Sequence, residues 1–382
     1  MKIELITMWY NEEFLAPFFL NHYKWVDKIH ILLDADTDDN TEAIATGYPN
    51  VLIEHFKFPD MMDDVIKARK INEKYRSIPG ADYVIVVDSD EFIFCNTLDD
   101  SIKEHIIDKR KDFYFATLWQ IYQHESDTRL DATKPVYQQR RNGDPAIANC
   151  YVKPVVVRAG LDVVWGPGNH TLVFDSKPMA WLTANADIMA EYNVSVFPVD
   201  MLQGAHWKLF DLDETITRRI RNRTNRQSKL NLAANLTTHH HKTTIDDIID
   251  EYNRMKTSPI VIKDRKCTEN VKLKYNSIFE NILAESSFSE DYEVNLYDEG
   301  VGHLFESCAF PSWYDYIKPQ SVSDTLADEL FLMASEFHKN GYREKALLLI
   351  KKALMYSPDS LHFEFYRRQW EKEVTAGIDI EQ

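Results

Sequence analysis

The chain has 382 residues, of which 44% are apolar and 27% charged, with only 11 glycines and 14 prolines. This composition excludes a disordered or fibrous chain and predicts more than one folded domain. The net charge of −17 excludes a general affinity for duplex nucleic acid, so we expect no nucleic acid partner.

Cysteine spacing and hydropathy indicate the cellular compartment of the protein. The four cysteines are far apart in the chain and form no CxxC pair: Cys95, Cys150, Cys267 and Cys308. Such spacing is typical of reduced thiols and not of a disulfide framework or a zinc site. No apolar run reaches the about 18–20 residues of a bilayer span. We therefore expect a cytoplasmic protein without a transmembrane segment.

Strand-like and helix-like segments alternate from residue 2 to residue 88. Strand patterns cover 2–8, 28–33, 51–58 and 83–88, and helical patterns cover 14–25, 41–46 and 63–76. Polar residues follow three of the strands, at 11–13, 34–40 and 88–91. This alternation predicts an α/β fold with a mostly parallel sheet that binds ligands at the carboxyl ends of its strands.

The rest of the chain divides into three parts. Strand-like runs at 113–119, 151–157, 171–174 and 194–198 complete a first domain over 1–212. Residues 213–322 read as a helical extension with an acidic loop, and 323–382 as a helical segment. In this last part the spacing of Ala334, Tyr342, Ala346 and Pro358 is typical of one tetratricopeptide-like helix pair. We expect it to pack on the preceding helices, with binding of a protein partner as the alternative.

Three acids occur within four residues at the end of the fourth predicted strand: Asp88, Asp90 and Glu91. Like charges this close repel one another and lose hydration at a strand end, so a bound cation would relieve the conflict. The D-x-D spacing places Asp88 and Asp90 on one side of an extended chain. Mg²⁺ and Mn²⁺ prefer one or two carboxylates together with substrate phosphates. The segment therefore predicts a Mn²⁺ or Mg²⁺ site that assists the departure of a phosphate-bearing group.

Four segments, taken in order, carry a resemblance to a known family. They are 8–13 (MWYNEE), 34–41 (DADTDDNT), 69–72 (RKIN) with 80–83 (GADY), and 88–92 (DSDEF). Together they resemble family-2 glycosyltransferases with the GT-A fold, a Rossmann-like arrangement. The D-x-D-E-F form, with 153–156 (KPVV) and a later His206, resembles one branch of that family. The resemblance covers residues 1–95, extends loosely to 225, and departs at 35–37, where the commoner pattern contains Ser.

The resemblance implies a role for each matching residue. It places Asn11 and Glu12 against the nucleoside, Asp34 at the base or ribose, and Arg69 near the sugar or diphosphate. Asp88 would position the ribose and the metal, and Ser89 would lie with the substrate-binding residues. Asp90 would coordinate the ion, and His206 would complete its shell.

The activity implied is metal-dependent transfer of a sugar from a nucleotide-diphosphate sugar, with UDP as the default, to an acceptor hydroxyl with inversion. The acceptor would be a glycan or a lipid-linked molecule in glycan or polysaccharide synthesis. The resemblance puts the general base about 80–105 residues after the D-x-D pair, where Asp187 and His170 are equal candidates and Asp175 and Glu191 are weaker ones.

A basic run without acids lies between residues 216 and 229. Its members are Arg218, Arg219, Arg221, Arg223, Arg226 and Lys229. We expect a solvated helix face, and the alternative is a helix beside the active site that holds a pyrophosphate or an anionic, lipid-linked acceptor, with peripheral membrane contact. The triplet 239–241 (HHH) reads as a surface loop.

Other readings of the acids are weaker. A haloacid-dehalogenase-like phosphatase needs a nucleophilic Asp near the start of its fold, usually followed by Gly-Thr. A nucleotidyltransferase needs a Gly-rich loop after the first strand, and none is present. The alternating acids at 34–40 lack the Gly and the final Glu of a calcium-binding loop. A non-catalytic module that binds sugar nucleotides and protein partners is the remaining alternative.

Overall fold

The structure is a computed structural model. It describes residues 1–59, 61–95, 101–134, 139–140, 142–145, 152–170, 172–174, 177–179, 193–195, 202–228, 243–257, 322–356 and 361–375. Within these ranges, no helix has both the length and the apolar character needed to cross a membrane.

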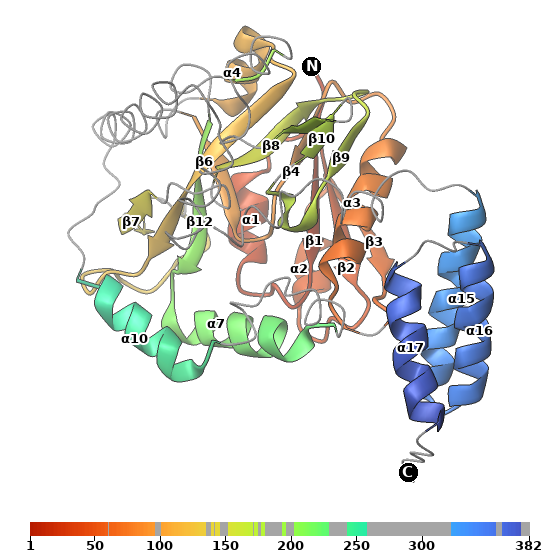
Figure 1. The fold of residues 1–382 in the computed structure, drawn as a ribbon. Helices are drawn as coiled ribbons and strands as arrows, with labels where there is room; N and C mark the ends of the chain where they lie inside the picture. The colour runs from red at the N-terminus through yellow and green to blue at the C-terminus, as the bar shows by residue number, and fades with distance from the viewer. Residues whose placement is uncertain are drawn as a thin grey trace, which may run out of the picture.

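Helices and strands alternate through the first part of the chain (Figure 1). The strands are β1 (Ile3–Trp9), β2 (Lys28–Asp34), β3 (Val51–Phe56), β4 (Tyr83–Val86), β5 (Glu91–Phe94), β6 (Phe113–Tyr122), β7 (Asn142–Pro145), β8 (Val152–Arg158), β9 (Val163–Trp165), β10 (Leu172–Phe174), β11 (Lys177–Met179) and β12 (Leu202–Leu209). The helices are α1 (Ala16–His22), α2 (Thr41–Ala45), α3 (Asp64–Ser77), α4 (Ile102–Lys109), η1 (Pro167–Asn169), α7 (Leu212–Ile216), η2 (Thr217–Arg223), η3 (Thr224–Arg226), α10 (Ile245–Met255), α15 (Val322–Lys339), α16 (Arg343–Tyr356) and α17 (Leu361–Thr375).

The described strands form a nine-stranded central sheet in the order β3-β2-β1-β4-β8-β6-β12-β5, with β7 paired to β6. Six of them (β1, β2, β3, β4, β6 and β12) run in one direction, and β5, β7 and β8 run in the other. A small antiparallel sheet, β9-β10-β11, lies outside this path. The predicted α/β class with a mostly parallel sheet is confirmed.

Burial on both faces explains why the first strands are parallel. Successive residues of β1, such as Leu5 and Ile6, point to opposite faces, and both are fully buried. All four residues of β4 are also buried. Helices therefore cover both faces of this part of the sheet, as parallel strands require.

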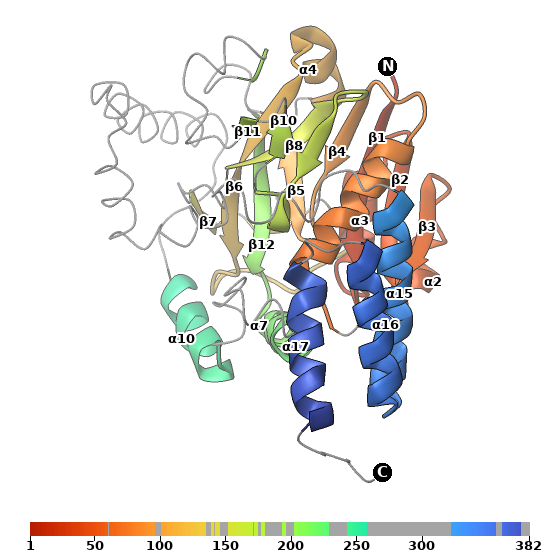
Figure 2. The same ribbon diagram turned by 45° about the vertical axis from the view of Figure 1, so that its right-hand side comes forward.

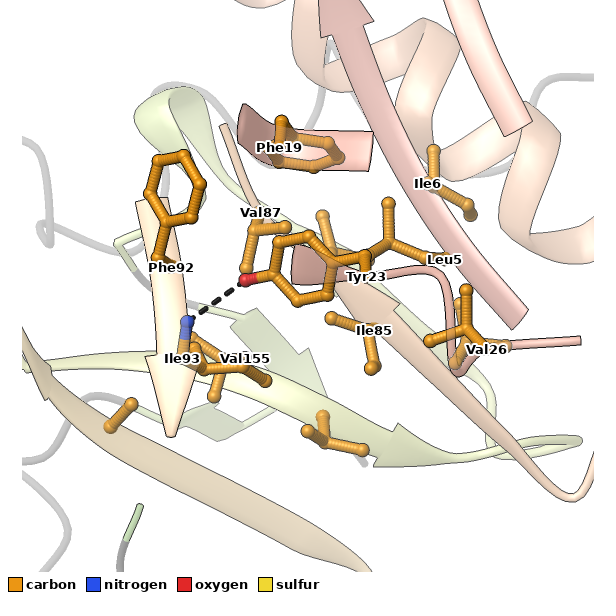
Figure 3. Packing of buried hydrophobic residues seen from close by; sticks show 14 of the residues in the cluster. Leu5, Ile6, Phe19, Tyr23, Val26, Ile85, Val87, Phe92, Ile93 and Val155 are labelled. Atoms are coloured by element: carbon orange, nitrogen blue, oxygen red, sulfur yellow. Dashed lines mark hydrogen bonds between the residues drawn. The ribbon is translucent and has the colours of Figure 1, made fainter. Parts of the chain in front are cut away.

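A buried tyrosine fixes the edge strand β5 against α1 (Figure 3). The hydroxyl of Tyr23 accepts a hydrogen bond from the backbone N–H of Ile93 and donates one to the carbonyl of Glu91, both at 2.9 Å. Because β12 pairs with only one side of β5, Tyr23 satisfies backbone groups on the other side. This contact anchors β5 directly after the acidic turn.

The C-terminal helices α15, α16 and α17 lie side by side (Figures 1 and 2). Their buried side chains form a core of their own. Its aromatic members are Phe331, Phe363, Tyr366 and Trp370, and each is at most 3% exposed. The helical extension on which this segment was predicted to pack covers 213–322, of which the structure describes only part, so that expectation stays a prediction.

Candidate functional site

A pocket opens where the carboxyl ends of β1, β2 and β4 meet the segment η2–η3. Its lining combines ionic and apolar side chains: Met8, Trp9, Tyr10, Glu12, Asp34, Phe56, Phe58, Met62, Lys67, Asp88, Ser89, Arg218, Asn222, Arg223 and Arg226. This is the edge of the sheet at which an α/β fold is expected to bind ligands.

The acidic segment forms the turn between β4 and β5. The N–H of Glu91 donates to the carbonyl of Asp88 at 3.0 Å, and the N–H of Asp88 donates to Glu91 Oε2 at 3.1 Å. The side chain of Asp90 is 3% exposed and that of Asp88 is 19% exposed. Asp88 therefore reaches the pocket, and Asp90 lies beneath it.

Two lysines neutralise Asp88. Lys67 Nζ on α3 donates to Asp88 Oδ1 at 2.8 Å, and Lys153 Nζ on β8 lies 3.5 Å from Asp88 Oδ2. Burial opposes ionisation of Asp88, but the two ammonium groups hold its pKa well below the usual value. Lys153 also pairs with Glu91, and the two carboxylates raise the pKa of this buried lysine. Asp88, Lys67 and Lys153 are therefore charged at neutral pH, whereas burial raises the pKa of Glu91 in spite of Lys153.

Two arginines neutralise Asp90. Arg218 Nη1 and Arg223 Nη2 both donate to Asp90 Oδ2, at 3.0 and 2.9 Å. His206 Nε2 lies 3.5 Å from the same oxygen, while its Nδ1 is bonded to Gln120 at 2.8 Å. Burial raises the cost of ionising Asp90, but the guanidinium groups hold its pKa well below the usual value. Asp90 is thus a permanent anion.

Arg218 also binds the residue that follows β1. It donates from Nη2 to Glu12 Oε1 at 3.0 Å and from Nε to Glu12 Oε2 at 3.2 Å, a bidentate pair. Ser89 Oγ donates to Glu12 Oε1 at 2.7 Å. One guanidinium therefore joins the loop after β1 to the turn after β4.

The segment η2 is π-helical, which explains how Arg218 and Arg223 reach the same carboxylate. Residues five apart point in directions about 140° apart on an α-helix of 3.6 residues per turn. Hydrogen bonding from i to i+5 brings them to the same side. Asn222 anchors the segment by donating to the carbonyl of Asn11 at 3.2 Å.

Opposite the acidic turn, Asp34 forms a second buried ion pair. Arg226 Nη2 donates to Asp34 Oδ2 at 2.8 Å, and the Arg226 guanidinium lies 3.4 Å from the centre of the Tyr10 ring. Asp34 is 1% exposed and Arg226 is 12% exposed. The cation therefore faces the pocket more than its anion does.

Only some of the site residues implied by the resemblance line the pocket. Those that line the pocket are Glu12, Asp34, Asp88 and Ser89. Asn11 is not in the lining, because its side chain exchanges hydrogen bonds with Asp38, at 2.6 and 2.9 Å, and adopts a positive φ of 50°. Arg69 is also outside the lining, which Lys67 enters from the same helix. Asp187 and the alternatives Asp175 and Glu191 lie outside the described residues.

His170 lies near the acidic turn, after the short helix η1. Burial and the neighbouring Lys153 lower its pKa well below the usual value. The preceding residue, Asn169, donates from Nδ2 to Asp88 Oδ1 at 3.4 Å. His170 is therefore a neutral imidazole at physiological pH, close to the pocket but weakly basic.

The expectation of a solvated basic face is wrong for Arg218, whose side chain is only 8% exposed. Arg221, by contrast, is 57% exposed, pairs with Asp38 at 2.8 Å and does not line the pocket. The one sequence signal for the pocket-lining arginines of this run was its lack of acids. The predicted boundary at 212–213 also separates these arginines from the carboxylates that they bind.

The predicted metal ligands Asp88, Asp90 and His206, as they are arranged, do not fit the expected Mn²⁺ or Mg²⁺. Among the described residues, no three His, Cys, Asp or Glu side chains are grouped so that they could hold a metal ion. Asp88 and Asp90 are already bonded to lysine and arginine, and His206 approaches Asp90 only at 3.5 Å. The charge conflict that suggested a metal is relieved by side chains of the chain itself.

Comparisons with known proteins add little to this geometry. No model of a protein family matches the chain, and no curated protein matches it in sequence. Among solved structures it is similar to 4-diphosphocytidyl-2C-methyl-D-erythritol synthase, with 11% identity over 42% of this chain and 76% of that chain and a TM-score of 0.26. This likeness is too slight to carry a functional argument.

Proposed function

We propose that the pocket binds a nucleotide-diphosphate sugar and that the protein is a glycosyltransferase. One observation carries the proposal: the pocket lining combines two kinds of side chain. The apolar and aromatic ones include Met8, Tyr10, Phe56, Phe58 and Met62. The cationic ones include Lys67, Arg223 and Arg226. A flat base joined to a diphosphate matches this combination, because bases pack on apolar and aromatic side chains and phosphates bind cationic N–H donors.

The place of the pocket in the fold supports the same ligand. It lies at the carboxyl ends of parallel strands, where α/β folds bind nucleotides. The order of the sequence segments, from the Asn11-Glu12 pair to the D-x-D turn, supports a sugar as the transferred group through the GT-A resemblance. In this proposal the acceptor is a hydroxyl of a glycan or of a lipid-linked glycan.

The reaction in this proposal breaks the bond between the anomeric carbon and the diphosphate oxygen and forms a bond from that carbon to the acceptor oxygen. The electron pair leaves with the diphosphate, and Lys67 and Arg223 stabilise the added negative charge. A general base takes the acceptor proton. The low pKa of His170 makes it a weak acceptor of protons, which supports Asp187 as the base.

The alternative of a haloacid-dehalogenase-like phosphatase is disfavoured. That chemistry needs the second Asp of the D-x-D pair to give up and take back a proton. Arg218 and Arg223 hold the pKa of Asp90 well below its usual value, so this carboxyl stays ionised. Asp90 therefore cannot serve as a general acid.

The function is tested by turnover of sugar nucleotides with the full-length protein. We expect release of a nucleoside diphosphate from one member of a sugar-nucleotide panel when a glycan acceptor is present. Asp187→Asn should lower this rate by about 10²–10⁴-fold, the usual contribution of a general base, and leave the affinity for the nucleoside diphosphate unchanged.

The matched control is Asp246→Asn, a change of the same type at an exposed position on α10, which should leave the rate unchanged. Release of a sugar phosphate would instead identify nucleotidyl transfer. Failure of every nucleotide and sugar nucleotide in the panel to bind would refute the proposal.

A further inference from the structure

We propose that this pocket holds a nucleoside diphosphate without a divalent cation, and that arginine and lysine side chains supply the charge that a metal would bring. The inference rests on the proposed function, since it concerns the same ligand at the same site. It goes against the metal dependence that the D-x-D pair suggested.

The first step is the charge balance of the cluster. At the pocket, five carboxylates form ion pairs with five lysines and arginines: Glu12, Asp34, Asp88, Asp90 and Glu91 with Lys67, Lys153, Arg218, Arg223 and Arg226. The formal charge of this set is zero without any added ion. The chain itself therefore supplies a cation for each of these carboxylates before any ion is added.

The second step concerns which cations bind Asp90. Both are guanidinium groups, which do not lose their proton in proteins. A metal ion at Asp90 Oδ2 would lie beside Arg218 and Arg223, whose nitrogens are 3.0 and 2.9 Å from that oxygen. Like-charge repulsion therefore opposes the metal for as long as these arginines stay in place.

The third step concerns how deeply the charged side chains are buried. The side chain of Arg223 is 30% exposed, and that of its partner Asp90 is 3% exposed. The side chain of Arg226 is 12% exposed, and that of its partner Asp34 is 1% exposed. Two pairs are exposed about equally: Lys67 and Asp88, at 18% and 19%, and Arg218 and Glu12, at 8% and 9%. The pocket therefore presents cations at its surface and buries most of the acids beneath them, an arrangement that attracts an anion and repels a cation.

These steps give the acids a different role from that of metal ligands. Asp90 and Asp34 hold guanidinium groups in place so that their remaining N–H donors can meet phosphate oxygens. A guanidinium carries five N–H donors, and the bond from Arg223 to Asp90 uses one of them. Arg223, as the most exposed of these cations, is the main phosphate-binding group.

Calorimetry of the full-length protein tests this inference, with UDP as the first probe, then nucleoside diphosphates of other bases, and uridine as a phosphate-free reference. We expect the Kd of the diphosphate in EDTA to be within about threefold of the Kd in manganese or magnesium, a difference below 1 kcal/mol. Arg223→Gln should weaken diphosphate binding by about 10- to 100-fold in both buffers, because a charged hydrogen-bond partner is lost, and leave uridine binding unchanged. Manganese should not restore the affinity of this variant.

Arg221→Gln is the matched control, because it removes the same charge two residues away at a position outside the pocket lining. It should bind the diphosphate like the unmodified protein. Binding of the diphosphate only with manganese or magnesium would overturn this inference and leave the proposed function standing. Equal loss of uridine and diphosphate binding in Arg223→Gln would also overturn it, by giving Arg223 a structural role. Failure of every diphosphate to bind in either buffer would refute the proposed function itself.

Discussion

At the scale of single residues, Arg218 links the loop after β1 to the turn after β4. Its guanidinium binds Glu12, Asp90 and the hydroxyl of Ser89, which come from two separate loops. A buried charge that loses its partner destabilises a protein strongly, so every member of this network depends on the others. Arg218 is for this reason a poor choice for a functional test, and the more exposed Arg223 is a better one.

Which residue of α3 faces the pocket, Lys67 or Arg69, is also a question at the scale of single residues. The resemblance pointed to Arg69, but Lys67 is the residue that lines the pocket and binds Asp88. Two residues apart on an α-helix, their side chains point in directions about 200° apart. The sequence placed the helix correctly, and the face that meets the pocket depended on how α3 packs.

A pH-dependent prediction concerns Asp64, at the start of α3. Burial raises the pKa of Asp64 to about 6 from 3.8, against the opposing charge of Lys67. The folded protein therefore holds this proton at higher pH than the unfolded chain, so the contribution of Asp64 to stability falls as pH rises from about 4 to about 6 and is constant above. Asp64→Asn should raise the free energy of unfolding at pH 7 by up to about 3 kcal/mol, with the gain vanishing below pH 4.

Urea denaturation of both proteins across this pH range checks the prediction. The comparison variant is Asp108→Asn, an exposed aspartate on α4, for which no such trend is expected. A difference between Asp64→Asn and the unmodified protein that does not change with pH would contradict the assignment.

At the scale of elements, the anchoring of β5 decides where the acidic turn lies. Tyr23, just after α1, bonds to two backbone groups of β5 that β12 does not reach. His22 adds a bond to the carbonyl of Ile93 at 2.8 Å. The end of α1 therefore holds β5 in position, and β5 in turn fixes the turn that carries Asp88 and Asp90.

Tyr23→Phe tests this anchor. The change leaves the N–H of Ile93 without the tyrosine hydroxyl in a buried place, which should lower the free energy of unfolding by about 1–3 kcal/mol. Chemical denaturation measures the loss. Tyr48→Phe is the matched control, because its hydroxyl makes one exposed, long bond of 3.4 Å to Asn21 and its removal should cost less than about 0.5 kcal/mol. Equal effects of the two changes would show that the Tyr23 contact does not stabilise β5.

At the scale of the whole molecule, the described residues contain two large apolar cores. One lies around the central sheet, and the other lies among α15, α16 and α17 (Figure 2). No residue of the helical core lines the pocket. Stability of the helices and binding at the pocket should therefore be separable.

Phe331→Ala tests this separation. Phe331 is 3% exposed and packs on Phe363, Tyr366 and Trp370, so its loss should destabilise the helical core by about 3–5 kcal/mol. We expect calorimetric scans to show an earlier transition for this part, while the Kd for a nucleoside diphosphate stays the same. A matching loss of nucleotide affinity would mean that the two cores are coupled.

The sequence by itself determined the α/β class, the order and approximate positions of the first strands and helices, and the position of the acidic turn after β4. These features follow from local periodicity and from the turn residues between the elements, which neighbouring positions in the chain encode. Only the tertiary structure decided what neutralises the acids. Arg218 lies 128 residues from Asp90 in the chain, and Lys153 lies 65 from Asp88. Ion pairs over such separations depend on which strands become neighbours and on the π-helical turn of η2, and no local pattern of residues records either one.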